Sequence, residues 1–211
     1  MSVLADLDDA LAARTDERIV VGVTGPPGSG KTTLARTLTE YYRRLHGDGF
    51  VGYLPMDGFH LSNTVLTQLN RSDRKGAPDT FDVDGYVALL SRAIGADRNV
   101  YAPGFDHTAG EPIAAALVLP ATSALIITEG NYLALDDGGW SPVAGLLTRL
   151  YYVDTPANLR RERLLPRHVA AGKSPEGVRD WVANVDEPNA ALVAGTRDRA
   201  DLVIDGTVPL V

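Results

Sequence analysis

The residues with the clearest chemical meaning form the pattern G-x-x-x-x-G-K-T at 25–32, called the phosphate loop below. Its glycines let backbone N–H groups curl around phosphates, while Lys31 reaches the outer phosphate oxygens and the Thr32 hydroxyl can ligate Mg²⁺. An apolar run, 18–24, precedes it and a helical pattern, 33–45, follows it, which is the context the pattern requires. We predict nucleoside triphosphate binding by Gly25, Pro26, Pro27, Gly28, Ser29, Gly30, Lys31, Thr32 and Thr33.

Acidic residues follow two other apolar runs: Asp57 comes after 50–54, and Glu129 after 124–128. A carboxylate that faces the phosphate loop can take the proton from an alcohol during phosphoryl transfer, so Asp57 is the candidate general base. An Asp-Gly hairpin turn is the alternative interpretation. A carboxylate at the end of a buried run is costly unless it is paired or binds a metal. We therefore expect Glu129 to contact Mg²⁺ near Thr32, or the acceptor, with a surface glutamate as the alternative.

Two short segments concentrate basic residues in a protein whose net charge is −7. One is 71–75, a candidate for phosphate or substrate contacts. In the other, Arg160, Arg163 and Arg167 share one face of a predicted helix. These arginines form either a solvated stripe or part of a small helical lid, approximately 156–180, that brings cations to the transferring phosphoryl group. Lys31, Arg163 and Arg167 are thus candidate catalytic residues beside the base.

Acceptor recognition is expected in the irregular middle of the chain, because long loops inside a compact domain are usually functional. The segment 101–112 is interpreted as a loop over the site, or as part of a hairpin with 115–119. His60 either hydrogen-bonds the acceptor or packs within its own loop. The candidate acceptor contacts are Asp57, His60, Lys75, Asp106, His107 and Glu129.

Five apolar runs alternate with helical patterns, which predicts a parallel sheet in an α/β fold. The runs lie at 19–23, 50–54, 124–128, 149–153 and 202–204. Ligands of such sheets lie beyond the carboxyl ends of the strands, where the phosphate loop and both candidate acids fall. An amphipathic helix within 1–13 is expected at the edge, and 1–211 is expected to form a single domain.

Composition limits the functional class. Hydrophobic residues make up 45% and charged residues 22%, as in soluble globular proteins. No apolar run has the length of a membrane span, and the acidic first residues do not resemble a secretory signal. The absence of cysteine excludes disulfides and thiolate metal sites. We expect a cytoplasmic protein that uses ATP and Mg²⁺, acts on a small molecule, and binds neither nucleic acid nor membrane. The oligomeric state stays open, a homodimer included.

Five motifs occur in the order seen in the phosphoribulokinase/uridine kinase superfamily, which this chain resembles. They lie at 25–33, 56–60, 74–82, 128–131 and 163–168. The third motif is similar to the pantothenate kinase branch. The whole string resembles bacterial kinases described as pantothenate kinase-like or fructose-transport-associated.

The resemblance implies a P-loop kinase fold: a five-stranded parallel sheet with helices on both faces and a small helical lid. It also implies that Asp57 is the catalytic base, that Glu129 is the acid of the Glu-Gly motif, and that Arg163 and Arg167 are lid arginines. Uridine kinases have a tyrosine where this chain has His60, and pantothenate kinases are longer. Neither substrate therefore transfers to this chain.

We predict an ATP-dependent kinase that phosphorylates a hydroxyl of a pantothenate-, sugar- or nucleoside-like acceptor. A uridine-type nucleoside kinase is one alternative. A nucleotide-binding switch or module without turnover is another, although no Asn or Thr is followed by Lys as a guanine motif requires.

Overall fold

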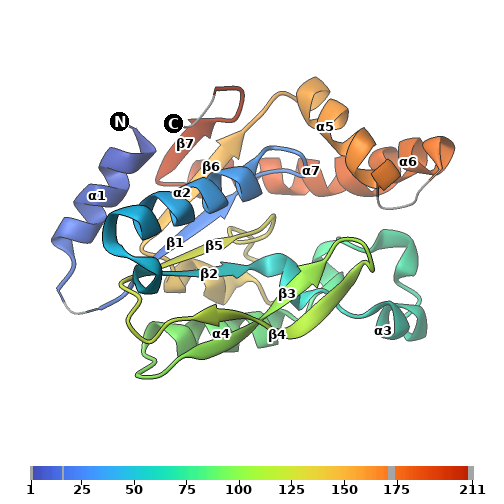
Figure 1. Cartoon of the computed structure of the whole chain (residues 1–211). Coiled ribbons are helices and arrows are strands. Elements are labelled where there is room, and N and C mark those ends of the chain that lie inside the picture. Colours follow the sequence, from blue (N-terminus) through green and yellow to red (C-terminus); the bar gives the residue numbers. More distant parts are fainter. Residues whose placement is uncertain (1, 16, 171–173, 209–211) are drawn as a thin grey trace.

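The computed structural model describes residues 2–15, 17–170 and 174–208. A parallel sheet in the order β2-β5-β1-β6-β7 lies at its centre (Figure 1). The strands are β1 (Ile19–Thr24), β2 (Val51–Pro55), β5 (Leu125–Glu129), β6 (Arg149–Asp154) and β7 (Leu202–Asp205). The predicted five-stranded parallel sheet is confirmed, and each strand ends within one residue of its predicted run. Because β1 and β5 are covered on both faces, they read as continuous apolar runs.

Helices cover both faces of the sheet, as predicted (Figure 1). One face carries α1 (Val3–Ala13) and α2 (Lys31–His46), and the other carries α4 (Val83–Ile94). The predicted N-terminal helix is α1, which is tied to the sheet where the Tyr151 hydroxyl donates to Asp6 at 2.8 Å. The remaining α-helices are α3 (Asn63–Gln68), α5 (Ala157–Ala170), α6 (Pro175–Trp181) and α7 (Glu187–Ala194). Residues 171–173 of the predicted lid lie outside the described residues.

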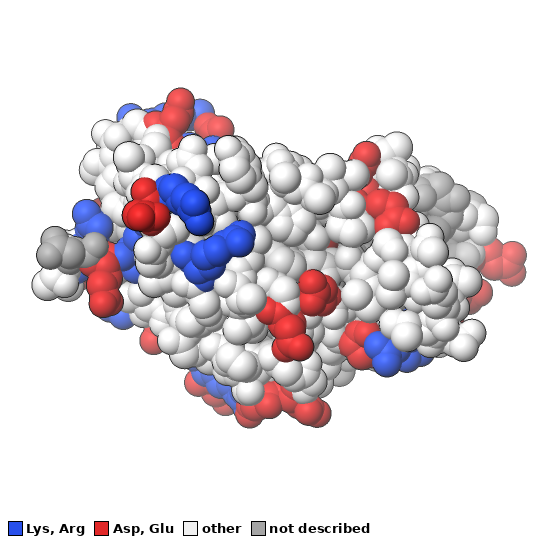
Figure 2. Space-filling model, turned by 90° about the horizontal axis from the view of Figure 1, so that it is seen from below, with Lys and Arg blue, Asp and Glu red and all other residues white. Residues whose placement is uncertain are grey.

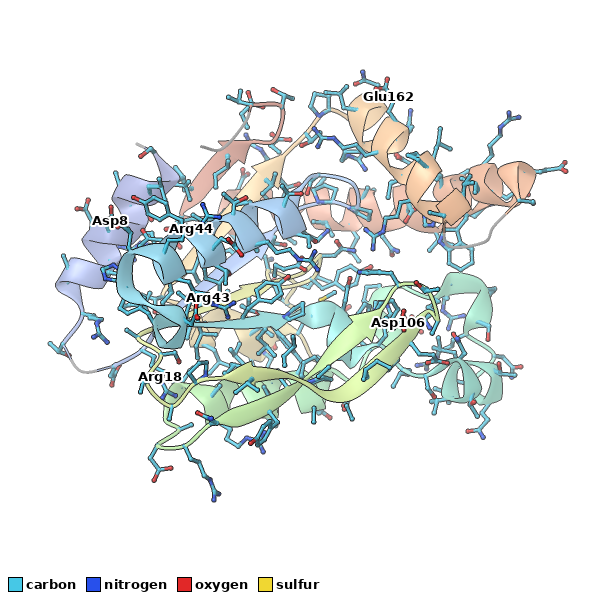
Figure 3. All side chains as sticks on the ribbon, viewed as in Figure 1. Asp8, Arg18, Arg43, Arg44, Asp106 and Glu162 are labelled. Atoms are coloured by element: carbon cyan, nitrogen blue, oxygen red, sulfur yellow. The ribbon has the colours of Figure 1, made fainter. Side chains whose placement is uncertain are left out.

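The segment 101–112 is mostly strand. β3 (Val100–Asp106) and β4 (Glu111–Leu119) form an antiparallel hairpin, so the hairpin interpretation is confirmed and the loop interpretation is wrong. Residues on β3 alternate between buried and more exposed positions, which is the pattern of a strand with one face on the core. Figure 3 shows Asp106 at the tip of this hairpin, where its carboxylate accepts the N–H groups of Thr108 and Ala109.

The hairpin face of the molecule carries scattered charges of both signs, with broad uncharged areas between them (Figure 2). None of the described helices is long and apolar enough to cross a membrane. The expectations about nucleic acid and membranes stay predictions.

A buried hydroxyl chain joins α4 to the sheet. Tyr86 is fully buried, and its phenol lies 2.6 Å from the Thr128 hydroxyl, which itself donates to the Leu54 carbonyl at 2.6 Å. Because the Thr128 proton is used on Leu54, the Tyr86 phenol must be the donor to Thr128. The chain fixes α4 against β2 and β5 beneath the strand ends that carry the candidate acids.

We predict that Tyr86→Phe lowers the free energy of unfolding by about 1–3 kcal/mol, since it leaves a buried acceptor on Thr128 without a partner. Chemical denaturation measures this change. The matched control is Tyr101→Phe. Because Tyr101 is 59% exposed, this variant should have nearly the wild-type free energy of unfolding. Equal stabilities of the two variants would contradict the prediction.

Candidate active site

The phosphate loop connects the end of β1 to the start of α2. Gly25, Gly28 and Gly30 have φ angles of 148°, 78° and 98°, which residues other than glycine rarely adopt. Gly28 is also limited by space, because a Cβ there would lie 2.7 Å from the Arg160 carbonyl oxygen. The glycines therefore allow a tight cradle whose end opens at the N-terminus of α2, a place that favours anions.

Lys31 and Glu129 carry opposite charges that act on one another. Both side chains are buried, with Glu129 only 3% exposed, so the surface-glutamate interpretation is wrong. Burial lowers the pKa of Lys31 and raises that of Glu129, while their attraction opposes both shifts. The Thr32 hydroxyl donates to Glu129 at 3.1 Å, so the two candidate Mg²⁺ ligands are in contact.

Tyr53 is a site residue that the sequence analysis missed. Its phenol donates to the second Glu129 oxygen at 3.2 Å, so two hydroxyls orient this carboxylate. The register explains the contact, since β2 and β5 run side by side with Pro55 opposite Glu129. A tyrosine near the end of an apolar strand is the signal that could have revealed it.

Asp57 lies in a 3₁₀ turn, Met56–Phe59, directly after β2. The turn leads to α3 and not to a paired strand, so the hairpin-turn interpretation is wrong. Burial lowers the pKa values of Lys31 and His60 and raises that of Glu129, and the Asp57 charge opposes the first two shifts and adds to the third. The Asp57 carboxylate therefore acts electrostatically on all three groups. Among the described residues, no side chain donates a hydrogen bond to this carboxylate.

His60 packs within its own loop. Its ring lies between the rings of Phe81 and Phe105, at centroid distances of 4.1 and 4.7 Å. Its Nδ1 lies 2.8 Å from the Asp57 carbonyl oxygen and donates to it, because that oxygen is only an acceptor. Burial lowers the pKa of His60, so a neutral ring holds the Asp57 turn in place. This packing leaves Nε2 as an acceptor, and contact with a substrate stays a prediction.

The other candidate acceptor contacts gather at the hairpin tip. The Lys75 ammonium donates to Asn63 Oδ1 at 2.6 Å and to the Gly110 carbonyl, and lies 5.6 Å from the centre of the Phe105 ring. Burial lowers the pKa of His107, and the charge of Arg167 lowers it further. Lys75 and His107 thus border the Asp57 side of the site. Asp106 uses its carboxylate to close the turn, and its predicted substrate contact is untested.

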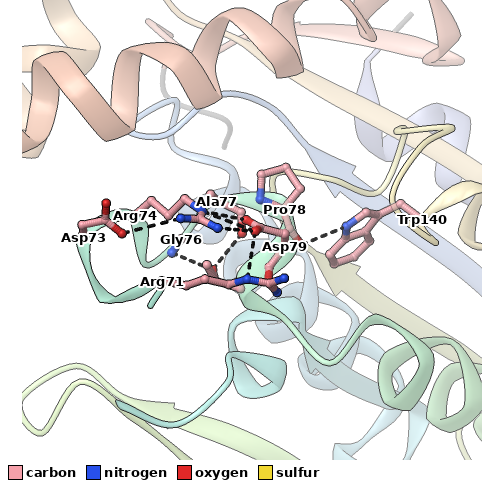
Figure 4. Close-up of polar contacts among 9 residues, drawn as sticks. Arg71, Asp73, Arg74, Gly76, Ala77, Pro78, Asp79 and Trp140 are labelled. Atoms are coloured by element: carbon pink, nitrogen blue, oxygen red, sulfur yellow. Dashed lines mark hydrogen bonds and ion pairs between the residues drawn. The ribbon is translucent and has the colours of Figure 1, made fainter. Parts of the chain in front are cut away.

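The arginines at 71–75 organise their own loop (Figure 4). Arg74 pairs with Asp79 at 2.9 Å and Arg71 pairs with it at 3.3 Å. Hydrogen bonding from Arg74 lowers the pKa of Asp79. The Trp140 indole donates to the Pro78 carbonyl at 3.4 Å and joins this loop to the aromatic core. Because Arg71 and Arg74 both pair with Asp79, their charges are used within this loop, and the segment 71–75 can be basic without these two arginines binding a ligand.

The lid arginines divide into two groups. Arg160 is 6% exposed, so the solvated-stripe interpretation is wrong for it. Arg160 and Arg163 donate to carbonyls of the phosphate loop. Burial lowers the pKa values of Lys31 and His60, and the charge of Arg167 adds to both shifts, so Arg167 acts electrostatically on the lysine of the phosphate loop. Whether Arg163 meets a phosphoryl group stays a prediction.

The phosphate loop, Asp57 and Glu129 thus lie at one edge of the sheet, because the loop follows β1, Asp57 follows β2, and Glu129 ends β5, which lies between those two strands. A sequence model of the Phosphoribulokinase / Uridine kinase family matches residues 20–209. The chain belongs to this family. The α/β fold described above is that of P-loop kinases.

Known relatives agree with this assignment. The protein YggC of Escherichia coli (strain K12) is 35% identical over 191 residues, covering 90% of this chain and 78% of YggC. A pantothenate kinase of Rhizobium meliloti is 28% identical over 222 residues, covering 92% of this chain and 67% of that enzyme. A crystal structure from Silicibacter sp. TM1040, described as a candidate fructose transport system kinase, has a TM-score of 0.84 at 30% identity and covers 97% of this chain and 100% of that one.

His60 gives the site a pH-dependent stability. Burial lowers the pKa of His60 in the folded protein below the ordinary 6.5. Below pH 6.5 the unfolded chain therefore binds more protons than the folded protein at this residue, which favours unfolding. The contribution of neutral His60 to the free energy of unfolding is fully present above pH 6.5. It is lost as the pH falls through the pKa of His60 in the folded protein. We predict that His60→Asn reduces the fall in unfolding free energy between pH 6.5 and 5.

Denaturant unfolding across that pH range measures the slope for each variant. The control is His46→Asn, because His46 is exposed. A wild-type slope in His60→Asn would contradict the prediction.

Proposed function

We propose that the protein transfers the γ-phosphoryl group of ATP to a hydroxyl of a small molecule. The observation that carries the proposal is the grouping of Lys31, Glu129 and Asp57, whose charges act on one another at the mouth of the phosphate loop. A nucleotide-binding module needs the loop and its lysine. A carboxylate held among these groups, with no hydrogen-bond donor among the described side chains, suits proton transfer as well.

The nucleotide half of the site uses the loop amides and Lys31 for the phosphates. Thr32 and Glu129 are the residues that would hold Mg²⁺, and a carboxylate with a hydroxyl fits this ion, which completes its ligands with water and phosphate oxygens. When bound, Mg²⁺ neutralises charge on the phosphates. Tyr53 keeps the Glu129 carboxylate turned toward Thr32.

In the acceptor half, Asp57 takes the proton of the acceptor hydroxyl. The hydroxyl oxygen forms a bond to the γ-phosphorus while the bond from that phosphorus to the β–γ bridging oxygen breaks, and ADP leaves. Lys31 and Arg167 face the charge that develops on the transferring group. Neutral His60 fixes the backbone of the Asp57 turn, which holds the base in place.

The acceptor class follows from the groups beside Asp57. Lys75, His107 and Arg167 supply hydrogen-bond donors and positive charge there. These groups suit a polyhydroxylated or anionic molecule, such as a sugar or a pantothenate-like hydroxy acid, and a nucleoside-like acceptor is the remaining option. A small molecule of this kind and ATP are both available in the cytoplasm, where we place the protein.

Asp57→Asn tests the base. We predict a fall in kcat of about 10²–10⁴-fold, the usual contribution of general base catalysis, with little change in ATP binding. ADP release measured with the true acceptor, together with calorimetric ATP titration, separates the two effects. Asp97→Asn, on an exposed loop, is the matched control. Normal turnover by Asp57→Asn would overturn the base assignment.

The acceptor is found by an ADP-release screen with ATP and Mg²⁺ against pantothenate, pentoses, hexoses and nucleosides. We expect a hit among the hydroxy acids or sugars that Asp57→Asn no longer phosphorylates. A nucleoside as the sole substrate would instead establish the uridine-type activity. ATP binding with no turnover of any alcohol would leave only the nucleotide-binding module.

A further inference from the structure

Three consecutive carbonyls of the phosphate loop accept hydrogen bonds from the β6–α5 segment. Arg160 Nη1 donates to the Pro27 carbonyl at 3.3 Å, and Arg163 Nη1 donates to those of Gly28 and Ser29 at 3.3 and 3.2 Å. The Thr155 hydroxyl also donates to the Ser29 carbonyl, at 2.9 Å. The loop backbone is thus bonded from outside by side chains that are far away in the sequence.

The same segment is anchored at its other contacts. Arg163 Nη2 donates to the Gly206 carbonyl after β7 at 3.1 Å, and buried Arg160 lies 3.8 Å from Glu187 on α7. The α5 backbone approaches so closely that a Cβ on Gly28 would meet the Arg160 carbonyl at 2.7 Å. The first turns of α5 are therefore packed onto the loop, and two elements beyond the loop hold the arginines in position.

These bonds fix the direction of the loop amides. In a trans peptide the C=O and the following N–H point in opposite directions. Carbonyls of Pro27 and Ser29 that are held toward α5 therefore turn the N–H groups of Gly28 and Gly30 away from it. The Ser29 N–H is used within the loop, on the Pro26 carbonyl at 3.1 Å. Amides with a fixed direction bind phosphate without first paying the cost of ordering a glycine-rich loop.

We propose that Arg160, Arg163 and Thr155 form a brace that holds the phosphate loop in its phosphate-binding conformation. They are positioning residues, and they act on the nucleotide through the loop backbone. Arg167, one helical turn beyond Arg163, is the lid arginine whose charge acts on Lys31 at the transfer site. The proposal rests on nucleotide binding at the loop, as in the proposed function, and needs no knowledge of the acceptor.

The test compares ADP with a non-hydrolysable ATP analogue, each with Mg²⁺ and without acceptor, by titration calorimetry. Because the loop binds phosphates that both nucleotides carry, we expect Arg160→Met and Arg163→Lys to weaken both by the same factor, about tenfold, and Thr155→Val by about fivefold. Arg167→Gln should weaken the ATP analogue more than ADP. Lysine keeps the positive charge of Arg163 but lacks its fork of N–H donors, so Arg163→Lys should not bind nucleotide as tightly as the wild type.

Thr155→Val is the sharpest variant, since it removes one hydroxyl and no charge. Arg179→Gln, an exposed lid arginine, is the control and should match the wild type. Thermal unfolding without nucleotide identifies any variant that fails to fold, and Thr155→Val together with Arg163→Lys then carries the test. Wild-type ADP affinity in both of these variants would overturn the brace.

A loss confined to the ATP analogue in Arg163→Lys would also overturn the brace, because it would place Arg163 at the γ-phosphoryl group. If the wild type itself bound neither nucleotide, the proposed function would fail instead. The two failures are therefore distinguishable.

Discussion

The burial of two oppositely charged side chains, Lys31 and Glu129, whose charges act on one another, is the constraint on which this structure depends. Either charge alone in that position would cost several kcal/mol, and removal of one would leave the other uncompensated. The charges of Lys31 and Glu129 therefore stabilise each other. Thr32 and Tyr53 donate hydrogen bonds to the Glu129 carboxylate. Only a fold that brings the loop after β1 next to the end of β5 can satisfy this requirement. The parallel sheet does so, because Val23 and Glu129 are register partners.

The sequence was sufficient to predict the parts of the molecule that depend on local patterns. Strand limits followed from apolar runs, and the phosphate loop followed from glycines at positions where φ is positive. The close contact of Thr32 with Glu129 was expected because parallel strands end at one edge of a sheet. Tyr53 was missed because its role depends on the register between β2 and β5, which periodicity does not encode.

The brace and the hairpin were harder to predict for related reasons. Arg160 and Arg163 share a helical face, and that face alone does not reveal whether it meets solvent, phosphate or a backbone carbonyl. Only the packing of α5 on Gly28 decides this. In the segment 101–112, Pro and Gly suggested a loop, but Val100 and Ala102 pack into the core on alternate positions and impose a strand. Tertiary burial outweighed the turn propensity there.

The proposed nucleotide half of the site consists mainly of backbone groups, and the proposed acceptor half consists mainly of side chains. This difference bears on specificity. The proposed nucleotide half has glycines at its turns and hydrogen-bond donors from Thr155 and from α5. The acceptor half is mainly side chains, and Asp57, His60, Lys75 and His107 all lie in the single connection between β2 and β5. Because β2 and β5 are neighbours in the sheet, this connection can change its side chains without altering strand order or the cradle. In the proposed kinase, the 56–119 segment would therefore select the acceptor, while the phosphate loop at the sheet edge would bind the phosphoryl donor.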